Sequence, residues 1–381
     1  MEIPDEYQGR EQTFLKHRVL RDYLVAWGHK LGSRSRFGAV RLWHVDCFAG
    51  PWKQRDADLA DTSIAIGLRA LEEAAATWRE QGYQINVGAL FVEPNDDAFA
   101  RLSEFLARRA GTVQTHAFHG EFGDHVEEIQ RRIGGDPAFI FVDPTGWRGA
   151  AMRFIAPLMG TRRDVMVNVM FNHVNRFKDD PRTFLREQMT DFFGLTEGEL
   201  PPHLDEEGLI ELYRGQLKRR GGLRFAADLA IPHPTRNRTW FRLAVGGNSP
   251  AVLDQFRDVE RKVVGQEAGI VRDAAARRRR ELRTAQPELG LGSNNPDQRY
   301  LAMRSMGIAG IEGVLREVLA SGPQPFVDVW PVLLERLHVT RSDAARRAFE
   351  LVREGKAVAS GLGPRERTIK DAHVVSLAGS S

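Results

Sequence analysis

The chain has 381 residues, of which 42% are hydrophobic and 28% are charged. This length is enough for two domains, and the composition is that of a folded protein rather than a disordered or fibrous one. Its 54 Lys and Arg barely exceed its 51 Asp and Glu, so a nucleic-acid partner must be argued from local patches.

The cysteine content and the terminal segment exclude several further classes. The single cysteine, Cys47, excludes an internal disulfide and a cysteine-based zinc cage, and we expect it to be a small buried packing residue. The first dozen residues are polar, and no later apolar run reaches the roughly 18 residues of a membrane span. We therefore expect a cytoplasmic protein with no membrane contact.

Residues 41–144 alternate short apolar runs with longer amphipathic stretches. The runs LWHVDC, VGALFVE and FIFVDP are typical of strands covered on both faces, and the stretches between them have helical spacing. This alternation predicts β-α-β units in a doubly wound, Rossmann-like α/β sheet. A further strand is expected at 164–171, and LRFAADLAI and TWFRLAV predict a closing strand pair.

The pattern changes after about residue 265. The segment VRDAAARRRRELR predicts a very basic helix, and LGLGSNNPDQ predicts a linker. Three helical stretches then precede two β-like pieces separated by GLGPRERTIKD, which is the order of a winged helix. We expect a large domain at 1–267, a basic helix and linker at 268–298, and a winged-helix-like α+β domain at 299–381.

Polar residues at the carboxyl ends of the expected strands are the candidates for a ligand site, because open α/β sheets bind ligands there. Asp46 ends the first strand before small residues that permit close backbone approach, and Glu93 can accept hydrogen bonds from a ribose diol. The candidate cofactor-binding residues at these ends are Asp46, Phe48, Ala49, Gly50, Glu93, Pro94, Glu121 and Phe122.

The sequence lacks two common nucleotide signatures, G-x-G-x-x-G after the first strand and G-x-x-x-x-G-K-[ST]. The expected site is rich in carboxylates and poor in phosphate-binding amides. These features suit a ligand that carries a ribose and a positive charge. S-adenosylmethionine, a sulfonium with an adenosine and an amino-acid tail, is such a ligand.

The same residues have structural alternatives. Asp46 could be a turn residue, Glu93 could be the N-cap of the following helix, and Asp143 could begin a turn. Lys16 and His17 fall on an N-terminal amphipathic helix and are expected on its solvated face.

Three histidines, His116, His119 and His125, invite a metal interpretation. Histidines three positions apart on a strand point to opposite faces, which is poor geometry for shared ligation. We expect no metal site.

Seven short motifs, in this order, resemble the three-Cys-motif partner protein family, TcmP, which is similar to class I S-adenosylmethionine-dependent methyltransferases. The resemblance covers roughly residues 12–265. It implies S-adenosylmethionine as cofactor, a cofactor-binding role for Ser63, a site role for Lys16 and a three-cysteine-motif partner protein. The motifs are K-x-x-x-L-x-x-Y-L from Lys16, VDCFAGP at 45–51, TSIA at 62–65, FVEPN at 91–95, FIFVDPTG at 139–146, NVMFNHVNR at 168–176 and DFFG at 191–194.

The resemblance also implies a reaction. In methyltransferases that act on exocyclic amino groups, the fourth strand ends in an acid or amide followed by proline, and both supply acceptors for the amino group. This assigns catalytic roles to Asp143 and to the carbonyl of Pro144. Trp147 is expected to stack on a base. Asn168, Asn172 and Asn175 are expected either to line the target pocket or to form turns.

Two segments are candidates for contact with nucleic acid. The basic helix has six arginines against two acids in RDAAARRRRELR, and its alternative is a solvated face. In the winged helix, TRSDAARRAFELVREG would be the recognition helix, with Arg341, Arg346 and Arg347 near its amino-terminal half and Arg346 expected to bind substrate. The alternative is a winged helix that dimerises or docks a partner.

Together these features predict an S-adenosylmethionine-dependent methyltransferase that acts on an exocyclic amino nitrogen of RNA, DNA or a nucleotide-like target. One alternative is a small-molecule or peptide methyltransferase of a biosynthetic or defence cluster. Another is a degenerate methyltransferase-fold binding module. In that case Trp52, which stands where the family usually has glycine, would block the cofactor. Thr145, where the family often has an aromatic residue, is the second departure.

Overall fold

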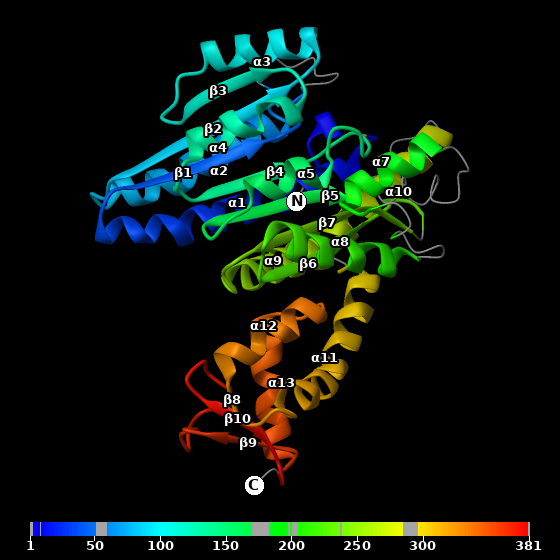
Figure 1. The fold of residues 1–381 in the computed structure, drawn as a ribbon. Coiled ribbons are helices and arrows are strands. Elements are labelled where there is room, and N and C mark those ends of the chain that lie inside the picture. Colours follow the sequence, from blue (N-terminus) through cyan, green and yellow to red (C-terminus); the bar gives the residue numbers. More distant parts are fainter. Residues whose placement is uncertain are drawn as a thin grey trace. The chain divides into compact units, whose positions relative to one another are not determined.

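The computed structural model describes residues 3–7, 9–50, 59–169, 183–196, 199, 205–236, 238–284 and 296–379. The chain divides into two compact units, which can be followed by colour in Figure 1. Unit 1 consists of residues 1–249 and 271–291, and unit 2 consists of residues 250–270 and 292–381.

Unit 1 is built on a seven-stranded sheet with the order β3-β2-β1-β4-β5-β7-β6. Strands β1 to β5 are parallel to one another, and β7 runs antiparallel to β5 and β6. The predicted doubly wound, Rossmann-like α/β sheet and its closing strand pair are therefore confirmed. The strands are β1 (Val40–Asp46), β2 (Ile85–Glu93), β3 (Gln114–His119), β4 (Ala138–Val142), β5 (Arg163–Val169), β6 (Phe225–Pro232) and β7 (Thr239–Gly247).

Helices cover both faces of this sheet, which explains the nearly continuous apolar strands. On β4 every residue is buried. Phe139 faces α1, where Tyr23 lies 5.4 Å from it between ring centroids, whereas Ile140 belongs to the core cluster that includes residues of α4, α7 and α8. The helices of unit 1 are α1 (Glu11–Gly32), α2 (Ser63–Glu80), α3 (Asp96–Arg108), α4 (Val126–Ile133), α5 (Met152–Ile155), α7 (Thr183–Phe193) and α8 (Glu206–Gly221).

Helix α1 packs closely on α2, and a glycine makes this approach possible. A Cβ added at Gly28 would lie 2.7 Å from the Cβ of Ala74, which is shorter than real contacts of this kind. The amino-terminal half of α1 is thereby fixed near the carboxyl end of the sheet, because α2 begins directly after the loop that follows β1.

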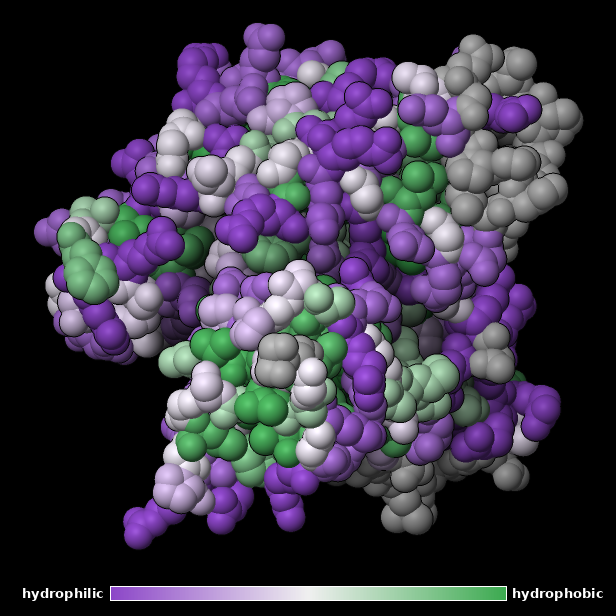
Figure 2. Space-filling model, turned by 60° about the horizontal axis from the view of Figure 1, so that its bottom comes forward, coloured by the Kyte–Doolittle hydropathy of each residue, from purple (hydrophilic) through white to green (hydrophobic). Residues whose placement is uncertain are grey.

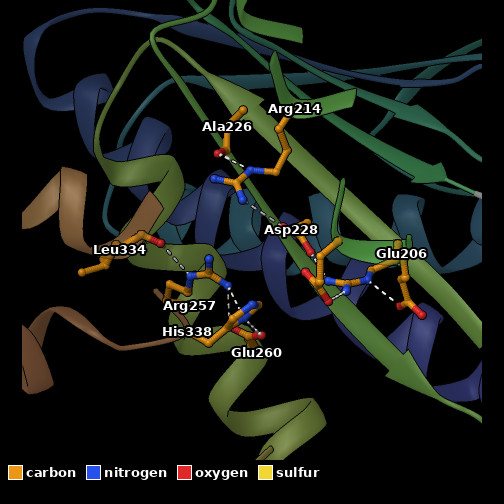
Figure 3. Close-up of polar contacts among 10 residues, drawn as sticks. Glu206, Arg214, Ala226, Asp228, Arg257, Glu260, Leu334 and His338 are labelled. Carbon is orange, nitrogen blue, oxygen red and sulfur yellow. Dashed lines mark hydrogen bonds and ion pairs between the residues drawn. The ribbon is translucent and has the colours of Figure 1, made fainter. Parts of the chain in front are cut away.

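A buried ion-pair network ties α8 to the β6–β7 hairpin (Figure 3). The Arg242 guanidinium donates to Asp228 at 2.6 Å and to Glu206 at 2.8 Å, and it also pairs with Glu207. Arg214 reaches the other oxygen of Asp228 at 3.2 Å. The neighbouring carboxylates raise the pKa of Arg242 against the opposing effect of burial, so this cation is satisfied within the fold.

Unit 2 combines helices with a small antiparallel sheet of order β8-β10-β9. Helix α9 is followed without a break by a π-helical turn, Val263–Glu267, and by α10 (Ala268–Thr284), most of which belongs to unit 1. The elements of unit 2 are α9 (Ala251–Lys262), α11 (Gln298–Leu319), β8 (Gln324–Pro325), α12 (Phe326–Arg336), α13 (Arg341–Arg353), β9 (Ala357–Ser360) and β10 (Val374–Leu377).

A second buried network joins α9 to α12 inside unit 2 (Figure 3). Arg257 donates from Nε to the carbonyl of Leu334 at 2.9 Å and from Nη1 to Glu260 Oε2 at 2.7 Å. His338 Nδ1 lies 2.7 Å from the other oxygen of Glu260. Both Arg257 and Glu260 belong to α9 and are 1% exposed, so their contacts with Leu334 and His338 hold α9 in buried surroundings.

The surface seen in Figure 2 is mostly hydrophilic, with a group of hydrophobic residues below its centre. The large hydrophobic side chains that unit 2 leaves exposed are Leu301, Met306, Val327 and Val358. No helix within the described part of the chain is long and apolar enough to cross a membrane.

Candidate functional site

The carboxyl ends of β1, β2 and β4 meet at one edge of the sheet, and a cavity of 240 Å³ opens there. This volume lies just below the roughly 300 Å³ at which small-molecule sites usually begin. The lining residues are Arg10, Thr13, Lys16, His17, Phe48, Gly50, Asp61, Thr62, Ser63, Glu93, Pro94, Asp143 and Thr145.

Asp46 ends β1 beneath this cavity and is completely buried. Its carboxylate accepts hydrogen bonds from Ser63 Oγ at 2.6 Å and from the backbone N–H of Phe48 at 3.2 Å. Burial raises the pKa of Asp46 to about 7, and these two hydrogen bonds only partly oppose the shift. Asp46 therefore shapes the loop after β1 and also carries a carboxylate whose ionised form the fold stabilises only in part.

Glu93 ends β2 at the rim of the cavity. It accepts a hydrogen bond from the backbone N–H of Asn95 at 2.7 Å, but the N-cap of α3 is Asn95 itself, so the capping alternative for Glu93 is wrong. Burial raises the pKa of Glu93, and the nearby charge of Glu121 raises it further, against the lowering effect of the Asn95 hydrogen bond. A positively charged or hydroxyl-bearing ligand would stabilise this carboxylate.

Asp143 follows β4 and is held from two sides. Lys16 Nζ donates to its Oδ2, and Asn168 Nδ2 donates to its Oδ1 at 2.7 Å. Asn168 lies within β5 and is 1% exposed, so it forms no turn there. Because a carboxylate has about four lone-pair positions, Asp143 keeps the capacity to accept hydrogen bonds from a ligand in the cavity.

The expectation that Lys16 and His17 lie on a solvated face is wrong, because they are only 8% and 7% exposed. Lys16 pairs with Asp143 and places its ammonium 5.1 Å from the ring centre of Phe241. His17 Nδ1 lies 2.9 Å from the hydroxyl of Tyr7, and burial together with the charge of Lys16 holds the pKa of His17 well below its usual value. The amino-terminal half of α1 is therefore a wall of the cavity.

Sequence reasoning missed three other residues of the cavity lining, namely Arg10, Thr13 and Asp61. Arg10 pairs with Asp61, a contact between residues 51 positions apart. No local signal marks such a pair, because charged residues near the start of a helix and in a loop are common on any surface.

The remaining expected site residues lie around the cavity rather than in its lining. Ala49 and Phe122 are buried beside it, and the ring of Phe122 lies 5.8 Å from that of Phe48. Glu121 is exposed at the start of the turn after β3. Pro144 is buried between two lining residues, Asp143 and Thr145.

Trp147, the expected base-stacking residue, is 6% exposed and belongs to the hydrophobic core. Its indole N–H donates to Gln188 of α7 at 3.0 Å. The expectations on Trp52, Asn172 and Asn175 lie outside the described residues.

The three histidines of the β3 region have separate contacts. His119 lies 2.9 Å from Asp96 and stacks on Phe99, and His125 contacts the carbonyl of His119 at 3.0 Å. Among the described residues no group of three or more His, Cys, Asp or Glu side chains is arranged to hold a metal ion. Cys47 is buried, as expected, and burial raises the pKa of its thiol.

Comparisons with known proteins add resemblances in fold at low similarity. No protein-family model and no curated protein sequence matches the chain. Among solved structures, a Legionella pneumophila protein is 9% identical, with 65% of this chain and 89% of that chain covered and a TM-score of 0.35. A Klebsiella pneumoniae protein described as a putative O-methyltransferase is 11% identical, with 61% and 89% covered and a TM-score of 0.25.

A further structure, described as an S-adenosylmethionine-dependent methyltransferase from Anabaena variabilis, is 10% identical, with 56% and 81% covered and a TM-score of 0.24. Scores this low carry no argument about function. The assignment of the fold rests on the strand order and directions of the sheet itself.

A second cavity, of 490 Å³, lies within unit 2 beside the start of α13. Arg341 is paired there with Asp254 and Asp371, and Arg347 is paired with acids that include Glu354. Arg346 is exposed and has no ion pair with any described residue. The lining residues are Asp254, Asp258, Arg341, Ser342, Ala345, Arg346, Arg367 and Thr368.

Proposed function

We propose that the chain is an S-adenosylmethionine-dependent methyltransferase that acts on an exocyclic amino nitrogen. The observation that carries this proposal is the position of Asp143, whose carboxylate is held between Lys16 and Asn168 at the cavity. The sheet of unit 1 supplies the fold, and its carboxyl edge is where such folds bind their ligands.

The residues at this edge fit a cationic cofactor with a ribose. The pKa of Asp46 is raised to about 7 and that of Glu93 is also raised, mainly by burial, so both carboxylates would gain from a nearby positive charge. Glu93 would accept hydrogen bonds from the two ribose hydroxyls. Asp46 would face the cationic end of the cofactor. Gly50 and Ser63 line the space between them.

When bound, S-adenosylmethionine supplies a methyl carbon that the acceptor nitrogen takes as the carbon–sulfur bond breaks and its electron pair stays on sulfur. Asp143 accepts an N–H of the amino group, which directs the nitrogen lone pair away from the carboxylate. The same carboxylate takes the proton that the methylated nitrogen releases. Lys16 and Asn168 position Asp143, and orientation of this kind contributes roughly 7 to 11 kcal/mol.

The test is a methyl-transfer assay with labelled cofactor on pooled RNA, DNA and a small-molecule extract. We expect Asp143→Ala to lose turnover by about 10²-fold or more with little change in cofactor affinity, since one aimed electrostatic contact is worth about 2.7 to 4 kcal/mol. Asp143→Asn should keep part of the activity because its amide retains an acceptor oxygen. Mass spectrometry should find the new methyl group on nitrogen.

Two results would overturn the proposal. Calorimetry that shows no heat with S-adenosylmethionine or with its demethylated product, on folded protein, would favour the binding-module alternative. A methyl group on carbon, on a ribose oxygen or on a carboxylate would contradict the amino acceptor. Glu128→Gln is a matched control, because Glu128 forms surface ion pairs on α4, away from the cavity.

A further inference from the structure

Helix α10 is strongly basic. It has six arginines against two acids within 17 residues. Its inner face is buried at Val271 and Ala275, whereas Arg279 and Arg283 are exposed. These last two arginines are four positions apart and therefore lie on the same face of the helix.

Three of the six arginines of α10 are not neutralised by any other described residue. Arg277, Arg279 and Arg283 have no ion pair with any described residue. Other arginines of unit 1 are paired within the chain, as Arg10 is with Asp61. Three uncompensated guanidinium groups on one helix leave a local positive field that an anionic partner would satisfy.

This helix lies beside the cavity wall. Arg278 Nη1 is 3.6 Å from Glu11 Oε1, and a Cβ added at Gly9 would lie 3.6 Å from the same nitrogen. Glu11 is the first residue of α1, and the cavity-lining Arg10 and Thr13 are its near neighbours. Arg279 and Arg283 follow Arg278 by one and five positions, which is a rise of about 1.5 and about 7.5 Å along the helix. They therefore lie near the cavity-lining residues at the start of α1.

We propose that Arg279 and Arg283 form a phosphate-binding surface that holds a nucleic acid while one of its bases enters the cavity. The inference rests on the proposed methyl transfer and names its substrate class. Nucleic acids combine a chain of phosphates with neutral exocyclic amino groups. An acidic protein would offer carboxylates to the arginines, but its lysine amines are protonated at neutral pH and lack the free lone pair that the reaction needs.

The base must leave a helical stack to reach Asp143, because a cavity of 240 Å³ admits no duplex. The proposal therefore concerns single-stranded nucleic acid or an extruded nucleotide. Contacts of arginine with phosphates position the strand and do not read its sequence. We expect binding through α10 to be tolerant of sequence.

The test measures binding of a fluorescein-labelled RNA of about 20 nucleotides and mixed sequence, and of the matching single-stranded DNA, to the full chain. The variant is the double substitution Arg279→Gln and Arg283→Gln. We expect affinity to fall roughly 10-fold at moderate salt, and the slope of log K against log salt between about 50 and 200 mM to decrease by about 1.4, or roughly 0.7 per phosphate.

The matched control is the double substitution Arg34→Gln and Arg41→Gln. Both residues are exposed in unit 1, and Arg41 lies at the amino end of β1, whereas the cavity lies at the carboxyl end. The control should bind the RNA as the unmodified chain does. The proposal would be overturned if the two double variants lost equal affinity for the RNA. It would also be overturned if the unmodified full chain bound neither the RNA nor the single-stranded DNA.

Calorimetry with the demethylated cofactor separates this inference from the proposed function. Both double variants should bind that ligand with unchanged affinity. If the cofactor binds but RNA affinity does not depend on α10, the substrate-class inference is wrong and the methyltransferase proposal stands. If RNA binds through α10 but no cofactor binds, the methyltransferase proposal is wrong and the phosphate-binding surface stands.

Discussion

Buried acids occur both at the cavity edge of unit 1 and where α9 contacts α12 in unit 2. Their pKa values are shifted in opposite directions. At the cavity edge, burial raises the pKa values of Asp46 and Glu93. In unit 2, the pKa of Glu260 is lowered even though burial opposes this, because His338 and Arg257 supply compensating charge and hydrogen bonds.

The difference separates an acid whose charge the fold compensates from acids whose charge it compensates only in part. Glu260 is completed by the chain itself, and its role is to fix α9. Asp46 receives two hydrogen bonds and no direct contact from a cationic side chain of the described residues, so the fold bears a charge that it does not fully stabilise. Perturbed groups of this second kind concentrate at functional sites.

The largest expected effect comes from disrupting the buried network of Arg257, Glu260 and His338. Glu260→Ala should reduce the stability of unit 2 by about 3 to 5 kcal/mol, because it leaves Arg257 buried without its partner. Hydrogen exchange of the α9 and α12 peptides, together with urea unfolding, measures this change.

Asp258→Ala is the control on the same helix. The Asp258 carboxylate is 61% exposed and lies 4.0 Å from Arg261, so its loss should cost less than about 1 kcal/mol. Equal effects of the two substitutions would show that the Arg257 network does not hold α9.

An intermediate effect should appear in the pH dependence of cofactor binding. A cationic ligand prefers ionised Asp46, and the pKa of this group in the free protein is about 7. Affinity should therefore rise by up to about tenfold per unit as pH increases towards 7 and then level off. Calorimetry with S-adenosylmethionine from about pH 5 to about pH 8 measures the profile.

Two variants sharpen this second prediction. Asp46→Asn removes the titrating group while keeping an acceptor for the Phe48 N–H, so its profile should be flatter. Glu93→Ala should weaken binding by roughly 10- to 150-fold at all pH values and retain the slope due to Asp46. A profile unchanged by Asp46→Asn would remove Asp46 from the cofactor site.

The sequence allowed the sheet and the acids at its edge to be predicted, because both depend on local pattern. Alternation of apolar runs and helical stretches determines the β-α-β units, and parallel strands must end at one edge. The positions of Asp46, Glu93 and Asp143 follow from that rule alone.

The α1 wall could not be predicted in the same way. Lys16 meets Asp143 across 127 positions of the chain, and such a contact depends on how α1 packs on α2. A lysine on an amphipathic helix gives the same local signal whether it is solvated or buried against a carboxylate. The basic helix was expected from its composition, but its contact with Glu11 required the tertiary fold.

The smallest expected effect concerns the two kinds of arginine on α13. Arg347 pairs with Glu312, Glu350 and Glu354, whereas Arg346 has no ion pair among the described residues. Arg347→Gln should therefore cost unit 2 about 0.5 to 1 kcal/mol, and Arg346→Gln should leave its stability within about 0.5 kcal/mol. Thermal unfolding measures both.

The same pair tests the expected winged-helix contact with nucleic acid. We expect a free arginine at Arg346 to contribute one phosphate contact, so Arg346→Gln should lower RNA affinity about threefold and reduce the salt slope by roughly 0.7. Arg347→Gln should leave binding unchanged, because its charge is already compensated by three glutamates. If Arg346→Gln also leaves RNA binding unchanged, unit 2 does not contact the RNA through α13. That result would favour the alternative in which the winged helix docks a partner.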